Sequence, residues 1–408
     1  MQEDELIPGL FRTEFSKITT VLCKLFGIEH IEIAEDITSD TFLSALETWT
    51  YKGVPENPKA WLYTVAKNKA KNYLHRNTLF TEKISSELKQ QTLDNKEFEI
   101  DLSDKNINDS QLKMLFVICH PSISVESQIS LALRILCGFG IDEIANALLS
   151  NSETIKKRLL RAKEKLRTEK LQLEFPGEIE INNRLENVLT TLYLLFNEGY
   201  YCESKDAIIR GDLCLEAMRL TYLLLENEQT NQTSVNALLA LMCFHASRFE
   251  ARKNNNDEII LYNEQDETLW NKELITKGAY FLHLASQGNR ISKYHLEANI
   301  AYWHTIKEDS QEKWENVLQL YNQLLQVEYS PIAALNRTFA LSKANGKHEA
   351  IEEAEKLKLT GNPYYYSLLG ELYTNIDNKK AKESLEKAFS SAKTQSDKNI
   401  ISKKISHL

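Results

Sequence analysis

Glycine and proline are scarce in this chain, whose 408 residues include 13 glycines and 7 prolines. These counts lie well below the average usage of roughly 7% and 5%. β-sandwiches and doubly wound sheets need many such residues at their turns and phosphate-binding loops. No apolar run approaches the roughly 18 residues that a membrane-spanning helix needs; the nearest is Leu192–Phe196. The composition therefore predicts an all-α protein without a membrane segment.

Signals for disulfides, metal ions and export are also missing. The six cysteines include no CxxC pair, and the first six residues are acidic and lack the apolar stretch of a signal peptide. Four histidines stand without the spacing of metal ligands: His245, His283, His295 and His304. We therefore expect a cytoplasmic protein with free thiols and no metal or other cofactor.

Charge is distributed unevenly along the chain. The total is −9, but residues 52–76 carry a local +5 and residues 156–170 a local +6, while residues 82–109 between them carry −4. A second polar break falls near Pro176 and Gly177. These shifts predict two basic modules on an acidic tether, followed by a longer helical part. The expected boundaries are 1–82, a linker 83–108, 109–172, a linker 173–184, and 185–408.

The segment 141–167 reads IDEIANALLSNSETIKKRLLRAKEKLR and predicts two short helices joined by a tight turn. Apolar residues recur at helical spacing on both sides of Ser150, and Asn151 is suited to cap a second helix. In a helix-turn-helix the second helix enters the DNA major groove, with flanking cations on phosphates. A basic solvated helix in an ordinary bundle is the alternative. The candidate DNA contacts are Ser152, Glu153, Lys156, Lys157 and Arg161.

A second basic helix is predicted over 57–77, NPKAWLYTVAKNKAKNYLHRN. Its apolar residues fit a core face, while cations interleaved with amide side chains on the other face suit an exposed nucleic-acid strand. Trp61 fits the core better than a stacking platform, and for Trp49 and Tyr51 both roles stay open. The candidate contacts are Lys67, Asn68, Lys71, Asn72 and Arg76.

The helix expected over 33–49 is acidic on its exposed side, where it carries Glu35, Asp36, Asp40 and Glu47. An acidic helix directly before a basic one can dock a protein partner while its neighbour binds DNA. A solvated amphipathic helix is the simpler alternative for this segment taken alone.

In order and spacing, the three segments resemble bacterial RNA polymerase sigma factors of the sigma-70 type, specifically the extracytoplasmic-function group. AEDITSDTFLSALETW is similar to region 2.2, the second basic helix to regions 2.3 and 2.4, and 141–166 to region 4.2, so the resemblance covers residues 10–171. Residues 185–408 resemble the subgroup with a long tetratricopeptide-like extension. That part of the resemblance rests on LTTLYLLFNEGYY, GDLCLEAMRL, YNEQDETLW and SPIAALNRTFAL.

This resemblance implies a non-enzymatic transcription initiation factor whose partners are core RNA polymerase and promoter DNA. Region 2 would hold the −10 element through the five candidate residues of 57–77. Region 4 would read the −35 element through those of 152–161 and lie at the β flap. The region 2.2 helix would dock on the clamp helices of the β′ subunit through Asp36, Asp40, Phe42 and Leu46.

The C-terminal part predicts a helical solenoid, in which Tyr366, Leu369, Gly370 and Tyr373, followed by Ala381, Leu385 and Ala388, resemble tetratricopeptide packing positions. We expect it to regulate activity in cis and to bind a protein or peptide. Two alternatives stay open: an adaptor whose DNA-binding module is degenerate, and an enzyme built on Asn197, Glu198, Gln265, Asp266 and Glu267. Arg248, Arg252 and Arg337 are expected to pair with these acids or with a ligand.

Overall fold

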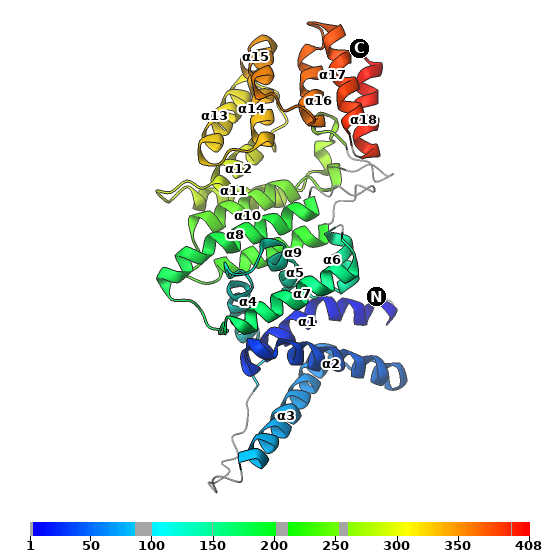
Figure 1. Ribbon diagram of the computed structural model, residues 1–408, viewed down its shortest axis with the longest axis vertical. Coiled ribbons are helices and arrows are strands. Elements are labelled where there is room, and N and C mark those ends of the chain that lie inside the picture. The colour runs from blue at the N-terminus through cyan, green and yellow to red at the C-terminus, as the bar shows by residue number, and fades with distance from the viewer. Residues whose placement is uncertain (1–2, 86–99, 149, 201–210, 253–259, 393) are drawn as a thin grey trace. The chain divides into compact units, whose positions relative to one another are not determined.

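The computed structural model describes residues 3–85, 100–148, 150–200, 211–252, 260–392 and 394–408. Throughout these ranges the secondary structure is helical, with no strand (Figure 1). The predicted all-α fold class is confirmed. The chain forms two compact units, residues 1–194 and 195–408. Most of the expected linker 83–108 lies outside the described residues.

The N-terminal unit is organised around its first helix, which contacts α2, α3, α4 and the π-helical turn η2. Phe15, Ile18 and Leu22 of this helix are fully buried. The bounds of the elements are α1 Glu3–Phe26, η1 Ile28–His30, α2 Ile31–Lys52, α3 Pro58–Ser85, α4 Asp104–Ile118, α5 Val125–Leu131, η2 Ala132–Leu136, α6 Ile141–Ala147, α7 Ser152–Thr168 and α8 Glu178–Tyr200. Both segments expected as basic modules therefore belong to one compact unit.

A tight turn after η2 brings the second half of this unit close to α1. Gly138 has φ +70°, and a Cβ at this position would lie 3.2 Å from the Arg12 carbonyl oxygen. Only glycine adopts this backbone conformation at such close approach without strain. The Arg12 guanidinium of α1 lies 3.6 Å from the centre of the Phe139 ring, so the residue after Gly138 also contacts α1.

The expected linker 173–184 is helical from Glu178 onward. Ile181 and Leu185 are buried on the N-terminal unit, and the Arg184 guanidinium donates to the Phe116 carbonyl oxygen at 2.5 Å. Acidic residues in the first turn favour a helix start immediately after Pro176 and Gly177. The polar side chains between the buried ones hid this helical period in the sequence, so the linker prediction was too long.

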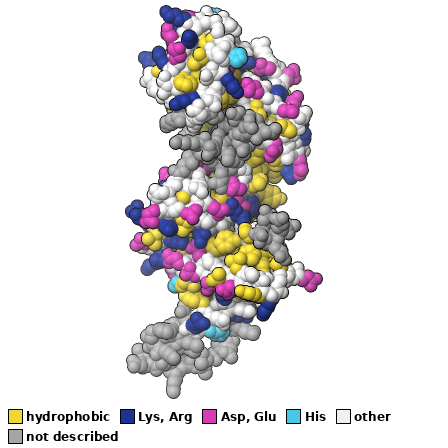
Figure 2. Space-filling view, turned by 90° about the vertical axis from the view of Figure 1, so that its right-hand side faces the viewer, with side chains coloured by type: hydrophobic (Ala, Val, Ile, Leu, Met, Phe, Trp, Pro, Cys, Tyr) yellow, Lys and Arg dark blue, Asp and Glu magenta, His cyan; other side chains and the backbone are white. Residues whose placement is uncertain are grey.

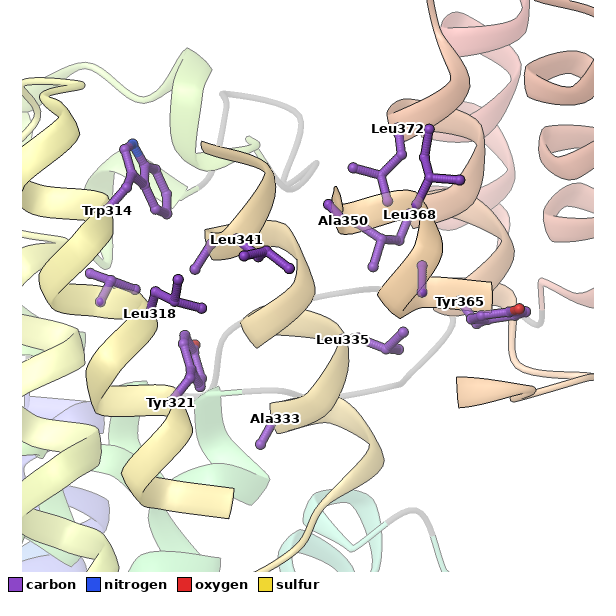
Figure 3. Packing of buried hydrophobic residues seen from close by; sticks show 14 of the residues in the cluster. Trp314, Leu318, Tyr321, Ala333, Leu335, Leu341, Ala350, Tyr365, Leu368 and Leu372 are labelled. Atoms are coloured by element: carbon purple, nitrogen blue, oxygen red, sulfur yellow. The ribbon is translucent and has the colours of Figure 1, made fainter. Parts of the chain in front are cut away.

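In the C-terminal unit, each helix from α12 to α18 packs on the next one along the chain. The apolar residues of α13 to α16 meet in one continuous core, with Trp314, Leu318 and Tyr321 of α13 on one side of α14 and Leu335 pointing toward Tyr365 on the other (Figure 3). Beyond the end of α8, the helices are α9 Gly211–Leu225, α10 Thr233–Ala246, α11 Lys272–Ala285, α12 Lys293–Trp303, α13 Gln311–Val327, α14 Pro331–Ala344, α15 Lys347–Leu357, α16 Pro363–Tyr373, α17 Asn378–Ser391 and α18 Gln395–Ser406. Three short 3₁₀ turns are η3 Glu250–Arg252, η4 Tyr262–Glu264 and η5 Glu267–Leu269.

Gly370 sets the distance between α16 and α17. A Cβ at this position would lie 2.6 Å from Leu385 Cγ and 3.3 Å from the Ala381 carbonyl oxygen. Gly370→Ala gains helix propensity of up to about 1 kcal/mol, but the overpacking it causes costs about 1–3 kcal/mol. We expect the C-terminal unit to lose about 1–2 kcal/mol, or roughly 3–6 °C in Tm. The matched control is Gly9→Ala in α1, where nothing lies within 4 Å. Equal Tm values for the two variants would contradict the packing role.

The described residues bear on the expectations for disulfides, membrane-spanning helices and metal sites. Five described cysteines are buried and form no disulfide: Cys23, Cys119, Cys137, Cys214 and Cys243. Cys202 lies outside the described residues. Within the described part, no helix is long and apolar enough to cross a membrane, and the same residues hold no group of three or more potential metal ligands.

Candidate nucleic-acid interface

Helix α7 presents a basic face. Ile155, Leu159, Ala162 and Leu166 are buried on one side of it. The helix begins where the sequence predicts, because the Asn151 Oδ1 atom accepts a hydrogen bond from the Thr154 amide at 2.7 Å. Helix α6 packs against α7 within the same unit. On the opposite side Glu153, Lys156, Lys157 and Arg161 are exposed.

The cations of this face differ in how they are paired. Lys157 forms an exposed ion pair with Glu153 at 3.6 Å, which contributes well under 1 kcal/mol. Ser152 is half-buried and its hydroxyl donates to the Asp142 carboxylate. Lys156 and Arg161 form no ion pair with any described residue. The exposed cations of α7 are therefore accessible to phosphate groups.

Helix α3 carries the second basic face. Leu62, Ala66 and Ala70 are fully buried. Asn68, Asn72 and Arg76 are exposed, and Lys67 and Lys71 are half-buried. Amides and cations thus share one side of the helix, as predicted.

The start of α4 lies beside this helix. Lys59 pairs with Asp104 at 3.4 Å. Hydrogen bonds from the Ser103 amide and hydroxyl lower the pKa of the Asp101 carboxyl, with smaller contributions from Lys67 and Lys24. A carboxylate therefore stands near the basic residues of α3 in the free chain.

The two aromatic residues in the last turn of α2 have separate roles. Trp49 is 5% exposed and packs edge-on against Trp61, with 5.3 Å between ring centroids. Trp49 is therefore a core residue. Tyr51 is 89% exposed at the end of α2, so its ring is available to stack on a base.

Helix α2 exposes part of the predicted polymerase-docking set. Asp36 and Asp40 are exposed, and Leu46 is 47% exposed. Phe42 is 3% exposed and packs on Phe11 at 5.0 Å between ring centroids, so its side chain belongs to the bundle core. Leu43 was not in the predicted docking set, but it is 52% exposed and lies beside Asp40 and Leu46 on the helix. Its position one helical turn after Asp40 is the signal that would have found it.

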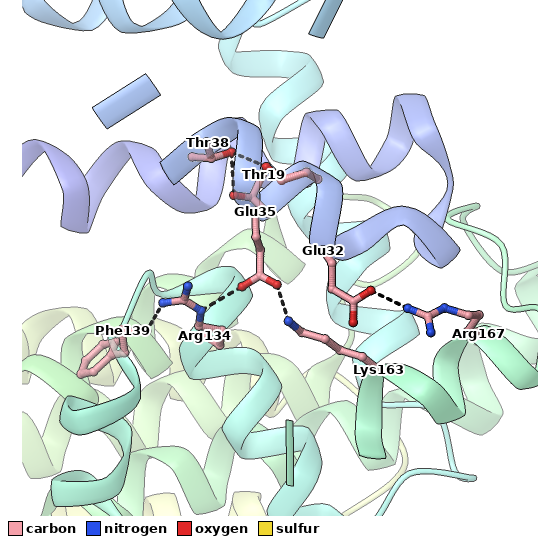
Figure 4. Close-up of polar contacts among 9 residues, drawn as sticks. Thr19, Glu32, Glu35, Thr38, Arg134, Phe139, Lys163 and Arg167 are labelled. Carbon is pink, nitrogen blue, oxygen red and sulfur yellow. Dashed lines mark hydrogen bonds and ion pairs between the residues drawn. The ribbon is translucent and has the colours of Figure 1, made fainter. Parts of the chain in front are cut away.

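Glu35 corrects another expectation, because this carboxylate is buried (Figure 4). Its Oε1 atom accepts from Arg134 Nε at 2.8 Å, and its Oε2 atom pairs with Lys163 of α7. Arg134 also donates to the Phe139 carbonyl oxygen at 3.1 Å. One carboxylate of α2 thus joins η2 and α7. We call Glu35, Arg134 and Lys163 the Glu35 triad.

A second, exposed ion pair lies beside the Glu35 triad. The Arg167 guanidinium reaches the Glu32 carboxylate at 2.5 Å and the Glu29 carbonyl oxygen at 3.3 Å. Two of the cations that give α7 its charge therefore neutralise acids of α2. Glu32 and Glu35 are three residues apart and Lys163 and Arg167 four, so each pair lies about one turn apart on its helix, a complementarity the sequence analysis did not use.

Charged side chains of both signs are interspersed on the face shown in Figure 2. This agrees with the net charge of −9 and shows no single large basic field there.

Comparisons with known proteins agree with this geometry. Residues 10–79 match the model of sigma-70 region 2, and residues 184–286 match a family of unknown function, DUF6596. The uncharacterised protein R00370 of Rhizobium meliloti (strain 1021) is 32% identical over 385 residues, which cover 93% of this chain and 90% of that protein. No solved structure matches the chain.

The region 2 match over residues 10–79 supports a sigma-70 type factor; proteins with this region are transcription factors that bind core RNA polymerase and promoter DNA. The chain belongs to the same family as the Rhizobium meliloti protein.

Two of the residues considered for an enzyme or for pairing with its acids have local structural partners. Asp266 caps the η5 turn by accepting from the Thr268 amide at 2.9 Å. Arg337 pairs with Asn322 at 2.6 Å and with Glu353 at 3.5 Å. Gln265 is 4% exposed, whereas Glu198 and Glu267 are exposed.

Proposed function

We propose that the chain is a sigma factor of the extracytoplasmic-function type. The observation that carries this proposal is the sequence of modules: a region 2 domain with the basic face of α3, followed by a capped basic helix at α7. In this proposal α3 holds the −10 element through Lys67, Asn68, Lys71, Asn72 and Arg76. Tyr51 adds a stacking surface for an unpaired base.

Helix α7 is proposed as the region 4 recognition helix. Since Lys163 and Arg167 bind acids of α2, we assign the −35 contacts to the first half of the helix. The assigned residues are Ser152, Glu153, Lys156, Lys157 and Arg161.

The direct test is in vitro transcription by purified core RNA polymerase with the full chain, on promoters selected from a random library. We expect initiation from templates that share two conserved elements at a fixed spacing. Failure of the full chain to bind core polymerase would overturn the proposal and favour a helical adaptor with a degenerate DNA-binding module.

The exposed face of α2 is proposed to dock on the β′ clamp, through Asp36, Asp40 and Leu46 together with Leu43. Leu46→Glu should weaken core polymerase binding roughly tenfold, because it places a charge in an apolar contact. The side chain is half exposed, so folding should be unchanged. Leu215→Glu on α9, at 61% exposure, is the matched control. Equal affinity of both variants in a fluorescence-anisotropy titration would contradict this docking face.

The C-terminal unit is proposed to regulate the sigma modules in cis and to bind a protein or peptide on its tetratricopeptide-like helices. Its separate compact core and its length support this role. The test compares the full chain with residues 1–200, which keep the contact of Arg184 with Phe116, after circular dichroism has verified that the shorter chain is helical. Identical promoter activity and identical response to inducing conditions would contradict regulation in cis.

A further inference from the structure

Polar side chains from four separate segments of the C-terminal unit surround the ring of Tyr262. The Arg248 guanidinium carbon lies 5.5 Å from the ring centre and the Lys313 ammonium 5.2 Å. The His304 ring meets Tyr262 edge-on at 5.3 Å, and the Trp270 ring stacks at 6.3 Å. Together with Gln265, these residues are called the Tyr262 cluster.

Two cations of the Tyr262 cluster are buried. Arg248 is 7% exposed and Lys313 is 1% exposed. The Lys313 ammonium donates to two neutral oxygens, Tyr262 Oη at 3.0 Å and the Ile306 carbonyl at 2.5 Å. The Arg248 guanidinium forms no ion pair with any carboxylate of the described residues. A buried charge without a counter-charge is strongly unfavourable, so it calls for an anion.

Two carboxylates act on Tyr262, those of Asp309 and the exposed Glu267, and Asp309 is already engaged. The Asp309 carboxylate accepts from the Trp314 indole and from Lys343, the latter at 3.0 Å. These hydrogen bonds, that from Trp314 first, lower the pKa of Asp309. Burial and the Arg248 and Lys313 charges lower the pKa of His304 to about 3, so this ring is neutral at neutral pH. The field inside the cluster is positive.

Several polar atoms of the cluster are buried without a hydrogen-bond partner among the described residues. They are Arg248 Nε, Trp270 Nε1, His304 Nδ1 and Gln265 Oε1. Buried polar atoms in native proteins almost always have partners. Two of these atoms are obligatory donors, and one is an acceptor. Their gathering around one tyrosine indicates that a polar ligand completes the site.

We infer that the Tyr262 cluster binds a small organic carboxylate that also carries a hydroxyl or amine. The guanidinium fork of Arg248 matches a planar carboxylate in a bidentate contact. Because Lys313 is already bonded to two oxygens, one cation is available, which favours a monoanion over a phosphate dianion. Gln265 Oε1 accepts from the hydroxyl or amine, and the aromatic rings contact the apolar body.

The test uses the purified full chain and needs no polymerase, so its outcome does not depend on the proposed sigma activity. Thermal unfolding and tryptophan fluorescence are followed with lactate, benzoate, 4-hydroxybenzoate and inorganic phosphate at matched ionic strength. We expect lactate or 4-hydroxybenzoate to raise Tm by about 5 °C or more at roughly 100-fold excess over its Kd. Benzoate, which lacks a hydroxyl, should raise Tm less. If neither hydroxycarboxylate raises Tm, or if only benzoate or phosphate does, the inference is overturned.

Variants separate a binding role from a structural one. Arg248→Met should abolish the response while leaving the ligand-free Tm equal to or above that of the wild type, because it removes an unpaired buried charge. The control Arg337→Met removes an arginine with two described partners, and it should lower Tm and keep the response. If Arg248→Met lowers Tm like the control, Arg248 is structural and the inference fails. Arg248→Lys, which keeps the charge without the fork, should bind about tenfold more weakly.

Discussion

Reversing the charge of Lys156 and Lys157 together is expected to weaken promoter binding by about 100-fold or more at physiological salt. Each lysine that contacts a phosphate releases a counterion, so losing two contacts lowers the slope of log affinity against log salt by roughly 2. Repulsion between the new carboxylates and the DNA backbone adds to the loss. Transcription directed by the chain should fall below detection.

Folding should survive this double substitution. Both side chains are exposed, and the only described interaction lost is the Glu153 pair of Lys157 at 3.6 Å. Lys379→Glu with Lys382→Glu on α17 is the matched control, since it changes the total charge equally at two exposed positions outside the N-terminal unit. The measurement is a gel-shift titration at several salt concentrations beside a transcription assay. A Lys156/Lys157 variant as active as this control would refute the assignment of α7.

Glu35→Gln is expected to destabilise the N-terminal unit by about 3–5 kcal/mol. The substitution keeps the shape of the side chain but leaves Arg134 and Lys163 facing each other without a counter-charge in a contact where all three side chains are less than 20% exposed. Removing one partner of a buried ion pair has a cost of this size. Urea unfolding measures the loss in the free energy of unfolding, and hydrogen exchange of amides in α2, η2 and α7 shows where the unit is destabilised.

Glu32→Gln is the matched control, because its pair with Arg167 is close to half exposed and contributes about 1 kcal/mol or less. Salt should weaken the Glu32 pair more than the Glu35 triad, since exposed pairs are screened. Adding Lys163→Met to Glu35→Gln should recover part of the stability by removing one unpaired cation. Equal stability of Glu35→Gln and Glu32→Gln would show that the triad does not hold the unit together.

The elements that the sequence predicted correctly are those whose signals are local. The start of α7 follows from the capping geometry of Asn151, and the buried side of α3 follows from the period of Leu62, Ala66 and Ala70. Scarcity of glycine and proline was enough to predict an all-α fold.

The features that were missed depend on distant partners. Glu35 is buried because Arg134 and Lys163, 99 and 128 positions away, approach it from other helices. The start of α8 was read as a linker because its apolar residues are separated by polar ones, and Arg184 of this segment bonds to Phe116 of α4, 68 positions away. Gln265 and Arg248 drew attention in the sequence, but only the structure brings both into the Tyr262 cluster.

Burial of the five described cysteines has a consequence for redox chemistry. Burial is the largest cause that raises the pKa of the Cys119, Cys214 and Cys243 thiols to about 12, and it raises that of Cys23 further. Thiolate is the species that attacks oxidants, and at pH 8 only about one in ten thousand of such thiols is ionised. Ellman's reagent should therefore modify them only as fast as the surrounding helices open. We therefore expect an oxidant to react with these thiols only after the surrounding helices have unfolded, and not in the folded protein.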